Sequence, residues 1–147
     1  MTPDVNVLVA ASRSDHPHYA VARARLQRAV AAGAAGASFT LMPMVVASFL
    51  RLVTSPRVFS MPTPLLDAIG FVDALLAAPG AELARRGAEW QVLRQLCLDK
   101  SLGGNDLPDA WLAAATLQLG EHLVTFDRDF KKLLGRAQVT LLVPAGA

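Results

Sequence analysis

Short apolar segments alternate with helix-length segments along the whole chain, and this alternation restricts the fold more than any other feature of the sequence. Five short runs of mostly apolar and β-branched residues are predicted to be strands, at 2–5, 38–41, 81–84, 122–125 and 139–143. Apolar residues at helical spacing predict helices over 18–32, 43–53, 64–78, 89–100 and 107–119, with a short helical turn over 127–135. Strands that alternate with helices form an α/β domain with a mainly parallel sheet.

Proline, glycine and capping side chains mark the ends of these helices. Pro43 lies in the first turn of one helix, and Thr63 and Asp106 are the predicted N-caps of two others. The glycines at 103–104 and Gly120 end the helices that precede them. These residues set the predicted boundaries.

The composition is that of one folded domain. Of the 147 residues, 53% are hydrophobic and 18% are charged, which excludes a disordered chain and is ample for a packed core. This length is typical of one domain, so we expect a single domain over residues 1–147. The mean hydropathy of +0.37 is high for a lone domain, so we expect apolar surface to be covered by a partner, as in a homodimer.

One long uncharged stretch raises the question of a membrane span. Residues 29–50 carry no charge and are long enough to cross a bilayer. Gly33, Gly36 and Pro43 interrupt the stretch, so we interpret it as a helix end, a strand and a helix start, and we expect no membrane span. With no recognisable signal peptide and Cys97 as the single cysteine, we expect a cytoplasmic protein without disulfides.

An aspartate stands in an apolar segment at the start of the chain. Asp4 is followed by Val5, Val7 and Leu8, and no Lys or Arg lies near it in the sequence. Burial of a carboxylate costs several kcal/mol unless the group is paired or bound to a metal. Asp4 is therefore the strongest candidate for a functional acid.

Two further acids are predicted to lie at the same end of the sheet. Asp127 follows the strand at 122–125, and Asp109 lies in the first turn of the helix that precedes that strand. Ligand sites of parallel α/β folds form at the carboxyl ends of the strands, so these acids can converge with Asp4. Taken singly, Asp109 and Asp127 also fit a helix-dipole contact and an N-cap, and Asp106 and Asp129 fit a cap and a solvated charge.

Carboxylates that converge without a basic partner repel one another, and a divalent cation resolves that repulsion. Mg²⁺ and Mn²⁺ prefer oxygen ligands and retain several waters, so two or three carboxylates are enough. A water activated by such a cation can attack a phosphodiester. Residues 1–60 contain six Arg, no Lys and two acids, a positive excess that can hold a nucleic-acid backbone.

Four segments resemble the PIN-domain ribonucleases, and within them the VapC-type toxins of bacterial toxin–antitoxin pairs. The segments are DVNVL at 4–8, VVASFLRLVT at 45–54, GNDLPDA at 104–110 with LAA at 112–114, and LVTFDRDF at 123–130. The resemblance covers essentially the whole chain. No segment is decisive alone, but the ordered set at these spacings is specific.

The resemblance implies a three-layer α/β/α sandwich around a short, mainly parallel sheet. It also implies Mg²⁺- or Mn²⁺-dependent endonucleolytic cleavage of RNA and a cognate antitoxin protein as partner. The metal-binding and catalytic acids of the family fall on Asp4, Asp109 and Asp127. Asn6 and Thr125 match polar positions beside the site. Asp129 matches a frequent extra acid.

One position departs from the family pattern. The second acid of the family, usually a glutamate, falls on Ser48, and no Asp or Glu occurs between Asp15 and Asp67. A serine hydroxyl can hold a water that is bound to a metal but adds no charge. We therefore expect weaker metal binding, for which Asp106 or Asp129 can compensate.

Two alternatives remain open. Loss of the fourth acid is consistent with a degenerate PIN fold that binds RNA or a partner without cleaving. A phosphatase of the haloacid-dehalogenase type is less well supported, because that chemistry needs a second aspartate as general acid where Asn6 stands. Elsewhere, His16 and His18 are interpreted as loop surface, and Trp90, Trp111 and Cys97 as core residues.

Overall fold

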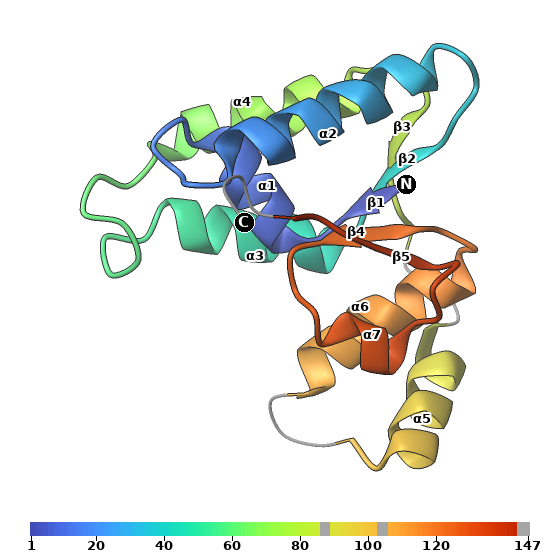
Figure 1. Cartoon of the computed structure of the whole chain (residues 1–147). Coiled ribbons are helices and arrows are strands. Elements are labelled where there is room, and N and C mark those ends of the chain that lie inside the picture. Colours follow the sequence, from blue (N-terminus) through green and yellow to red (C-terminus); the bar gives the residue numbers. More distant parts are fainter. Residues whose placement is uncertain (86–88, 103–105, 144–147) are drawn as a thin grey trace.

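The computed structural model describes residues 1–85, 89–102 and 106–143, apart from the side chain of residue 90. Five short strands alternate with seven helices over this part of the chain (Figure 1). The elements in chain order are β1 (Thr2–Pro3), α1 (Val5–Ser12), α2 (Tyr19–Gly33), β2 (Phe39–Leu41), α3 (Pro43–Val53), α4 (Leu65–Leu76), β3 (Ala81–Leu83), α5 (Glu89–Lys100), α6 (Leu107–Gln118), β4 (Leu123–Thr125), α7 (Phe130–Leu133) and β5 (Val139–Leu141).

All the strand pairs are parallel. Strands β1, β4 and β5 form one sheet in the order β1-β4-β5, and β2 pairs with β3. The Thr40 amide donates a hydrogen bond to the Met1 carbonyl at 2.9 Å, which joins the β2-β3 pair to β1. The predicted mainly parallel sheet is confirmed, and its strands all end at the same edge.

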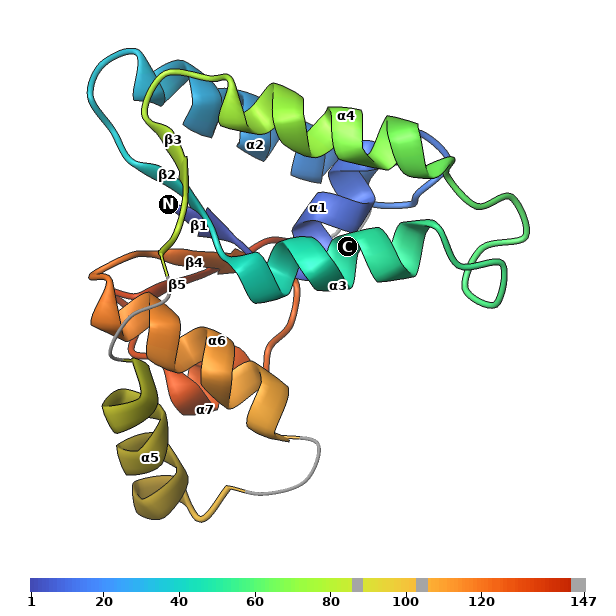
Figure 2. The ribbon, with the colours of Figure 1, turned by 180° about the vertical axis from the view of Figure 1, so that it is seen from behind.

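Helices cover both faces of the sheet, as an α/β/α sandwich requires. Helices α1 to α4 lie on one side of the strands and α5 to α7 on the other (Figures 1 and 2). The strands are short and mostly buried on both faces, which is typical of parallel sheets covered by helices. Phe39 of β2, Phe49 of α3 and Phe130 of α7 are among the largest fully buried side chains.

The first strand is shorter than predicted. We expected a strand over 2–5, but β1 ends at Pro3 and Asp4 is the N-cap of α1. The Asp4 carboxylate accepts the Val5 amide at 2.6 Å, which satisfies one of the unpaired donors of the helix. The cap therefore ends the strand and fixes the direction of the carboxylate.

One of the two predicted caps is wrong, and the other lies at the predicted position. The Thr63 hydroxyl accepts a hydrogen bond from Arg13, and Pro64 stands at the N-cap of α4 instead. Asp106 stands at the N-cap of α6 but makes no side-chain cap bond. The predicted break at 103–104 lies outside the described residues. No helix in the described part of the chain is long and apolar enough to cross a membrane.

Candidate active site

Asp4 lies at the carboxyl end of β1 and is almost fully enclosed. Only 5% of its surface is exposed. Its Oδ2 accepts one hydrogen bond from the Thr125 hydroxyl at 2.7 Å and another from the Asn6 side-chain amide at 3.0 Å. None of these donors carries a charge. Among the residues that the structure describes, no cation forms an ion pair with Asp4. The carboxylate is therefore held in one orientation by dipoles without neutralisation.

Asn6 and Thr125 join the start of the chain to the end of β4. The Asn6 amide nitrogen also donates to the Thr125 hydroxyl at 3.0 Å, and its amide oxygen accepts the Phe126 backbone amide at 3.3 Å. The Asp127 backbone amide donates to the same Thr125 hydroxyl at 2.9 Å. The parallel pairing of β1 with β4 produces this contact, because Pro3 is in register with Val124.

Asp127 and Asp109 approach Asp4 from two other elements. Asp127 follows β4, and its Oδ1 accepts the Asp129 backbone amide at 2.8 Å. Asp109 lies half-buried in the first turn of α6, the helix that leads back to β4. A helix that precedes a strand of the sheet begins near the edge where that strand ends, so α6 delivers Asp109 to the same edge.

The electrostatics of the three acids show that they share one region. Burial raises the pKa of Asp4 above its ordinary value, hydrogen bonds from Thr125 and Val5 partly offset this, and the charges of Asp109 and Asp127 raise it further. Burial likewise raises the pKa of Asp109, and the charge of Asp127 adds to it. Both carboxylates are thus destabilised in their charged form, which is the behaviour of acids that lack a cation.

A cavity of about 770 Å³ opens beside Asp4 and Asp109, between α3, α5 and α6. Ser48 of α3 lines it together with these two acids. Ser48 is half-buried and shares this lining with the two acids, whereas its match to the second acid of the family stays a prediction. The rest of the described lining is mostly apolar and comes from Val5, Met44, Val45, Leu93, Cys97, Leu98, Leu107, Pro108, Trp111 and Leu112, together with the basic Arg94.

Two residues expected in the core line this cavity instead. Trp111 is 37% exposed and Cys97 is half-buried, and both face the cavity. The prediction for them failed because α5 and α6 pack on each other at the margin of the molecule (Figures 1 and 2). Their apolar faces consequently border the cavity as well as the core.

The secondary acids contribute less. Asp129 forms an ion pair with Lys132 at 2.6 Å, and both side chains are largely exposed. Asp106 is exposed, and its charge acts on Asp109. Neither residue is buried beside Asp4, so the expected compensation for Ser48 stays a prediction.

The donor set fits a hard divalent cation. Carboxylate and hydroxyl oxygens are the ligands that Mg²⁺ and Mn²⁺ prefer, and Asp4, Asp109, Asp127 and Ser48 supply them. Within the described ranges, no three Asp, Glu, His or Cys side chains already stand close enough to hold one ion as they are. A shared cation would therefore have to draw the carboxylates closer together.

Sequence reasoning missed the contacts of the loop between α1 and α2. His16 and His18 were expected at the loop surface, yet both are half-buried, and the His18 ring stacks on Phe126 with ring centroids 4.8 Å apart. Arg13, counted among the basic residues available to nucleic acid, is buried. Its guanidinium contacts Asp15, the Thr63 hydroxyl, the Met61 carbonyl and the Phe59 ring.

Comparison with protein families finds a family model that matches most of the chain. Residues 1–134 match the family model described as "PIN domain". The match includes every acid described above and stops after α7, so β5 lies beyond it.

Curated relatives cover most of the chain. Ribonuclease VapC25 of Mycobacterium tuberculosis is 41% identical over 130 residues, which cover 88% of this chain and 89% of that protein. VapC ribonuclease Mb2897 of Mycobacterium bovis is 42% identical over 130 residues, with 88% and 86% covered. A chain in the crystal structure of VapBC2 from Rickettsia felis, bound to a DNA fragment from their promoter, superposes with a TM-score of 0.62 over 96% of both chains. At 18% identity, that likeness shows the fold alone.

Proposed function

The chain belongs to the PIN-domain family, with VapC ribonucleases as relatives, and from this premise we propose that it is an Mg²⁺- or Mn²⁺-dependent endoribonuclease that acts as the toxin of a toxin–antitoxin pair. The observation that carries the proposal is the enclosure of Asp4, an acid without a cationic partner in the described structure, beside Asp109 and Asp127. Such a set of acids costs stability, and a bound cation would offset that cost.

Asp4 and Asp109 would hold the cation, and Asp127 would complete the site. When bound, such a cation activates a water for attack on the scissile phosphate and neutralises charge that develops on the phosphoryl oxygens. The Thr125 hydroxyl and the Asn6 amide orient Asp4 through its Oδ2, while the Val5 amide holds Oδ1. This bracing means that Asp4 need not reorganise when charge develops during the reaction, which favours the transition state.

The two protein partners that we propose rest in part on the same family membership. We propose a cognate antitoxin protein, supported by the fold match to a chain of the VapBC2 assembly. We also retain a homodimer, supported by large apolar side chains that are exposed in a single chain. Those on α4 and the loop before it are Val58, Met61, Leu65, Leu66 and Ile69, and those on α5 and α6 are Leu98, Leu107 and Trp111.

A degenerate PIN fold without catalysis is the second candidate, and Ser48 is the observation that favours it. Ser48 faces the cavity where a further carboxylate would add ligand charge. Three carboxylates are nevertheless enough for a cation that keeps several waters. We therefore rank the nuclease first.

Cleavage of bulk RNA by the purified protein tests the proposal. The reaction is run with Mg²⁺, with Mn²⁺ and with EDTA, beside Asp4→Asn and a matched control, Asp73→Asn, which changes an exposed acid on α4. We expect metal-dependent cleavage by the wild type and by Asp73→Asn, and none by Asp4→Asn. RNA binding without cleavage under every condition, by folded protein, would instead support the degenerate module.

A further inference from the structure

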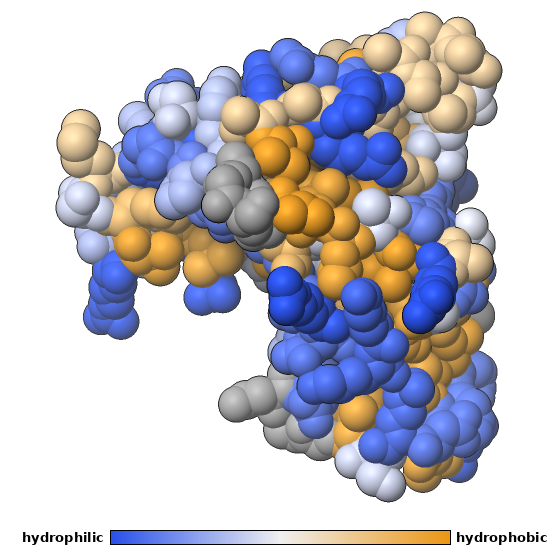
Figure 3. Space-filling model, viewed as in Figure 1, coloured by the Kyte–Doolittle hydropathy of each residue, from blue (hydrophilic) through white to orange (hydrophobic). Residues whose placement is uncertain are grey.

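A second charged region lies at the opposite edge of the sheet from the acids. Helix α2 carries Arg23, Arg25 and Arg28 and no acidic residue. Among the residues that the structure describes, no carboxylate forms an ion pair with any of the three. Figure 3 shows strongly hydrophilic side chains gathered over the middle of this helix. These arginines are therefore available to a ligand that carries negative charge.

Arg25 and Arg28 line a hollow of about 300 Å³ together with Met1 and Ser38. The Arg25 Nε is buried and has no hydrogen-bond partner, although its side chain is only half-buried overall. A buried donor without an acceptor costs about 1–3 kcal/mol. Arg28 uses its Nε to donate to the Ala24 carbonyl at 3.3 Å, which leaves its terminal nitrogens for another acceptor. Arg25 and Arg28 thus bring two guanidinium groups to the hollow, and no carboxylate of the described residues forms an ion pair with either.

The acid that contacts Met1 and Ser38 of this hollow already has partners of its own. Glu121 accepts hydrogen bonds from the Met1 ammonium at 2.9 Å, the Thr40 hydroxyl at 2.6 Å and the Ser38 hydroxyl at 3.1 Å. Its charge is neutralised by the Met1 ammonium. Glu121 therefore does not cancel the charge of Arg25 and Arg28, and the hollow remains positive.

We propose that Arg25, Arg28 and the hollow between them bind a backbone phosphate of the RNA at a point away from the cleaved bond. The proposal rests on the proposed function, because the substrate of that function supplies a phosphate at every nucleotide. A guanidinium fork matches a phosphate in a bidentate geometry, which the point charge of a lysine does not. An acidic protein segment is the competing ligand.

The position of the hollow determines which RNAs can reach it. Met1 precedes β1 and Asp4 follows it, so the hollow and the acids lie at opposite ends of this strand. Three residues of extended chain span about 10 Å, and nucleotides of a helical strand are about 3.4 Å apart. An RNA must therefore extend several nucleotides beyond the cleaved bond before it can touch both places.

Binding of RNA to the Asp4→Asn protein tests the site without cleavage. The probes are labelled mixed-sequence single strands of 30 and 3 nucleotides, and fluorescence anisotropy is measured over a range of salt concentrations. With Arg25→Ala/Arg28→Ala, we expect at least about a tenfold weaker affinity for the longer RNA. The slope of log affinity against log salt falls by about 1.4, the value for two lost contacts to a single strand. Affinity for the shorter RNA changes less than twofold.

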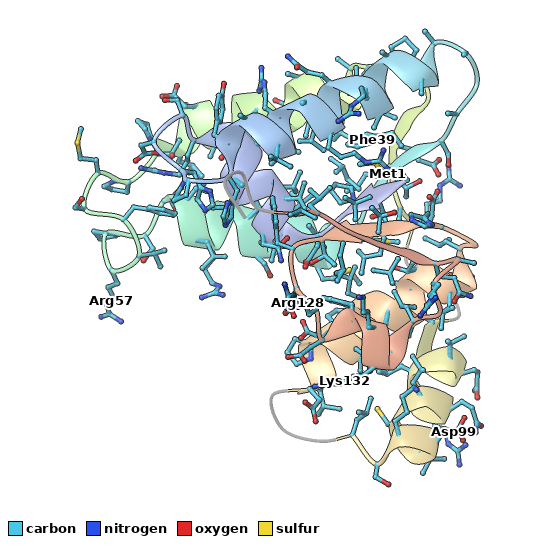
Figure 4. The ribbon with its side chains drawn as sticks, viewed as in Figure 1. Met1, Phe39, Arg57, Asp99, Arg128 and Lys132 are labelled. Carbon is cyan, nitrogen blue, oxygen red and sulfur yellow. The ribbon has the colours of Figure 1, made fainter. Side chains whose placement is uncertain are left out.

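Two single variants control for loss of charge and for folding. Arg28→Ala removes an exposed arginine from the hollow and does not disturb the core, and we expect a slope lower by about 0.7. Arg57→Ala removes the same charge from an exposed arginine that extends away from the body of the molecule (Figure 4), and we expect no change of slope.

The outcomes separate this proposal from the proposed function. Equal losses in Arg28→Ala and Arg57→Ala, or unchanged binding in the double variant, would overturn the phosphate site while the nuclease proposal stands. If neither the Asp4→Asn protein nor the wild type in EDTA binds the longer RNA, the phosphate site is overturned, while the proposed function is decided by the cleavage assay. Binding of an acidic peptide, lost in the double variant while RNA binding persists, would assign the hollow to a protein partner.

Discussion

Asp4 and Glu121 are carboxylates at opposite edges of the same sheet, and their surroundings are opposite. Glu121 pairs with the Met1 ammonium and accepts two hydroxyl groups, from Thr40 and Ser38. Asp4 accepts two amides and one hydroxyl, and the charges that act on it are those of Asp109 and Asp127. One carboxylate is neutralised by the protein and the other is left in need of a cation.

The pKa shifts of the two groups have opposite signs for this reason. Burial raises the pKa of Asp4. Burial would also raise the pKa of Glu121, but the hydrogen bonds from Thr40, the Met1 ammonium and Ser38, with the ammonium charge, hold it below its ordinary value. A raised pKa in the folded state opposes folding of the charged carboxylate, whereas a lowered one favours it. The difference agrees with a stabilising role of Glu121 and with the functional role that we propose for the acids near Asp4.

The largest expected effect is on catalytic activity at the carboxyl edge, the edge of the sheet where the strands end and where Asp4, Asp109 and Asp127 lie. Asp109→Asn should lower RNA cleavage about 100-fold or more, because a lost metal ligand forfeits several kcal/mol of transition-state stabilisation. The melting temperature of this variant should equal or exceed that of the wild type. Burial and neighbouring like charges raise the pKa of Asp109 and so destabilise its charged form, which the substitution removes. Cleavage rates and thermal melts of the same preparation check the expected activity and the expected stability. A variant that melts well below the wild type would place Asp109 among the structural residues.

At the amino edge, where the strands begin and where Glu121 lies, a substitution should change stability and not activity. Glu121→Gln should lower the free energy of unfolding by about 2 kcal/mol, in the range for a hydrogen-bonded charged group, and leave the cleavage rate of the folded protein unchanged. Urea unfolding gives the first value and initial cleavage rates give the second. Ser60→Ala, in an exposed loop, serves as the control for handling. A loss of activity without a loss of stability would contradict the assignment.

Much of this comparison could be predicted from the sequence. Pro43 and the helical spacing predicted α3 with its observed ends, and α5 was predicted as well. Asp4 was singled out because an isolated carboxylate in an apolar segment needs a partner, which is a local argument. Glu121 carried no such signal, because its partners Met1, Ser38 and Thr40 lie more than 80 residues away in the sequence.

The cavity and the buried arginine were missed for the same physical reason. Helical spacing predicts which face of a helix is apolar, but not whether that face meets the core or borders a cavity, so Trp111 and Cys97 were misplaced. Arg13 is enclosed by residues of the loop before α4, about 50 positions away. Contacts of this range follow from the packing of whole elements and have no counterpart in local patterns.

An added negative charge at the carboxyl edge should strengthen metal binding. Ser48→Glu places a further carboxylate on the cavity wall shared with Asp4 and Asp109. We expect affinity for Mn²⁺ to rise about tenfold, a gain of about 1.4 kcal/mol, measured by calorimetric titration. Ser48→Gln introduces a side chain of nearly the same size as glutamate but without its charge, so this variant should not show the gain in affinity. Equal affinities in the wild type and in both variants would remove position 48 from the metal site.

The smallest expected effect is on the pH dependence of stability. Because the pKa of Glu121 is lowered in the folded state, its contribution is complete above its ordinary value of 4.5 and is lost as the pH falls through the lower folded value. The difference in unfolding free energy between wild type and Glu121→Gln should therefore be constant near neutral pH and shrink on acidification. Urea unfolding at a series of pH values measures it. A difference that grows as the pH falls would reverse the assigned sign.

The most direct test of the contrast between the two edges is the effect of Mn²⁺ on thermal stability. A ligand that binds only the folded state raises the melting temperature, and the rise grows with the ratio of the ligand concentration to its Kd. Mn²⁺ should raise the melting temperature of the wild type and of Glu121→Gln by similar amounts and leave that of Asp109→Asn nearly unchanged. An equal rise in Asp109→Asn, or no rise in the wild type at millimolar Mn²⁺, would contradict a metal site at the carboxyl edge.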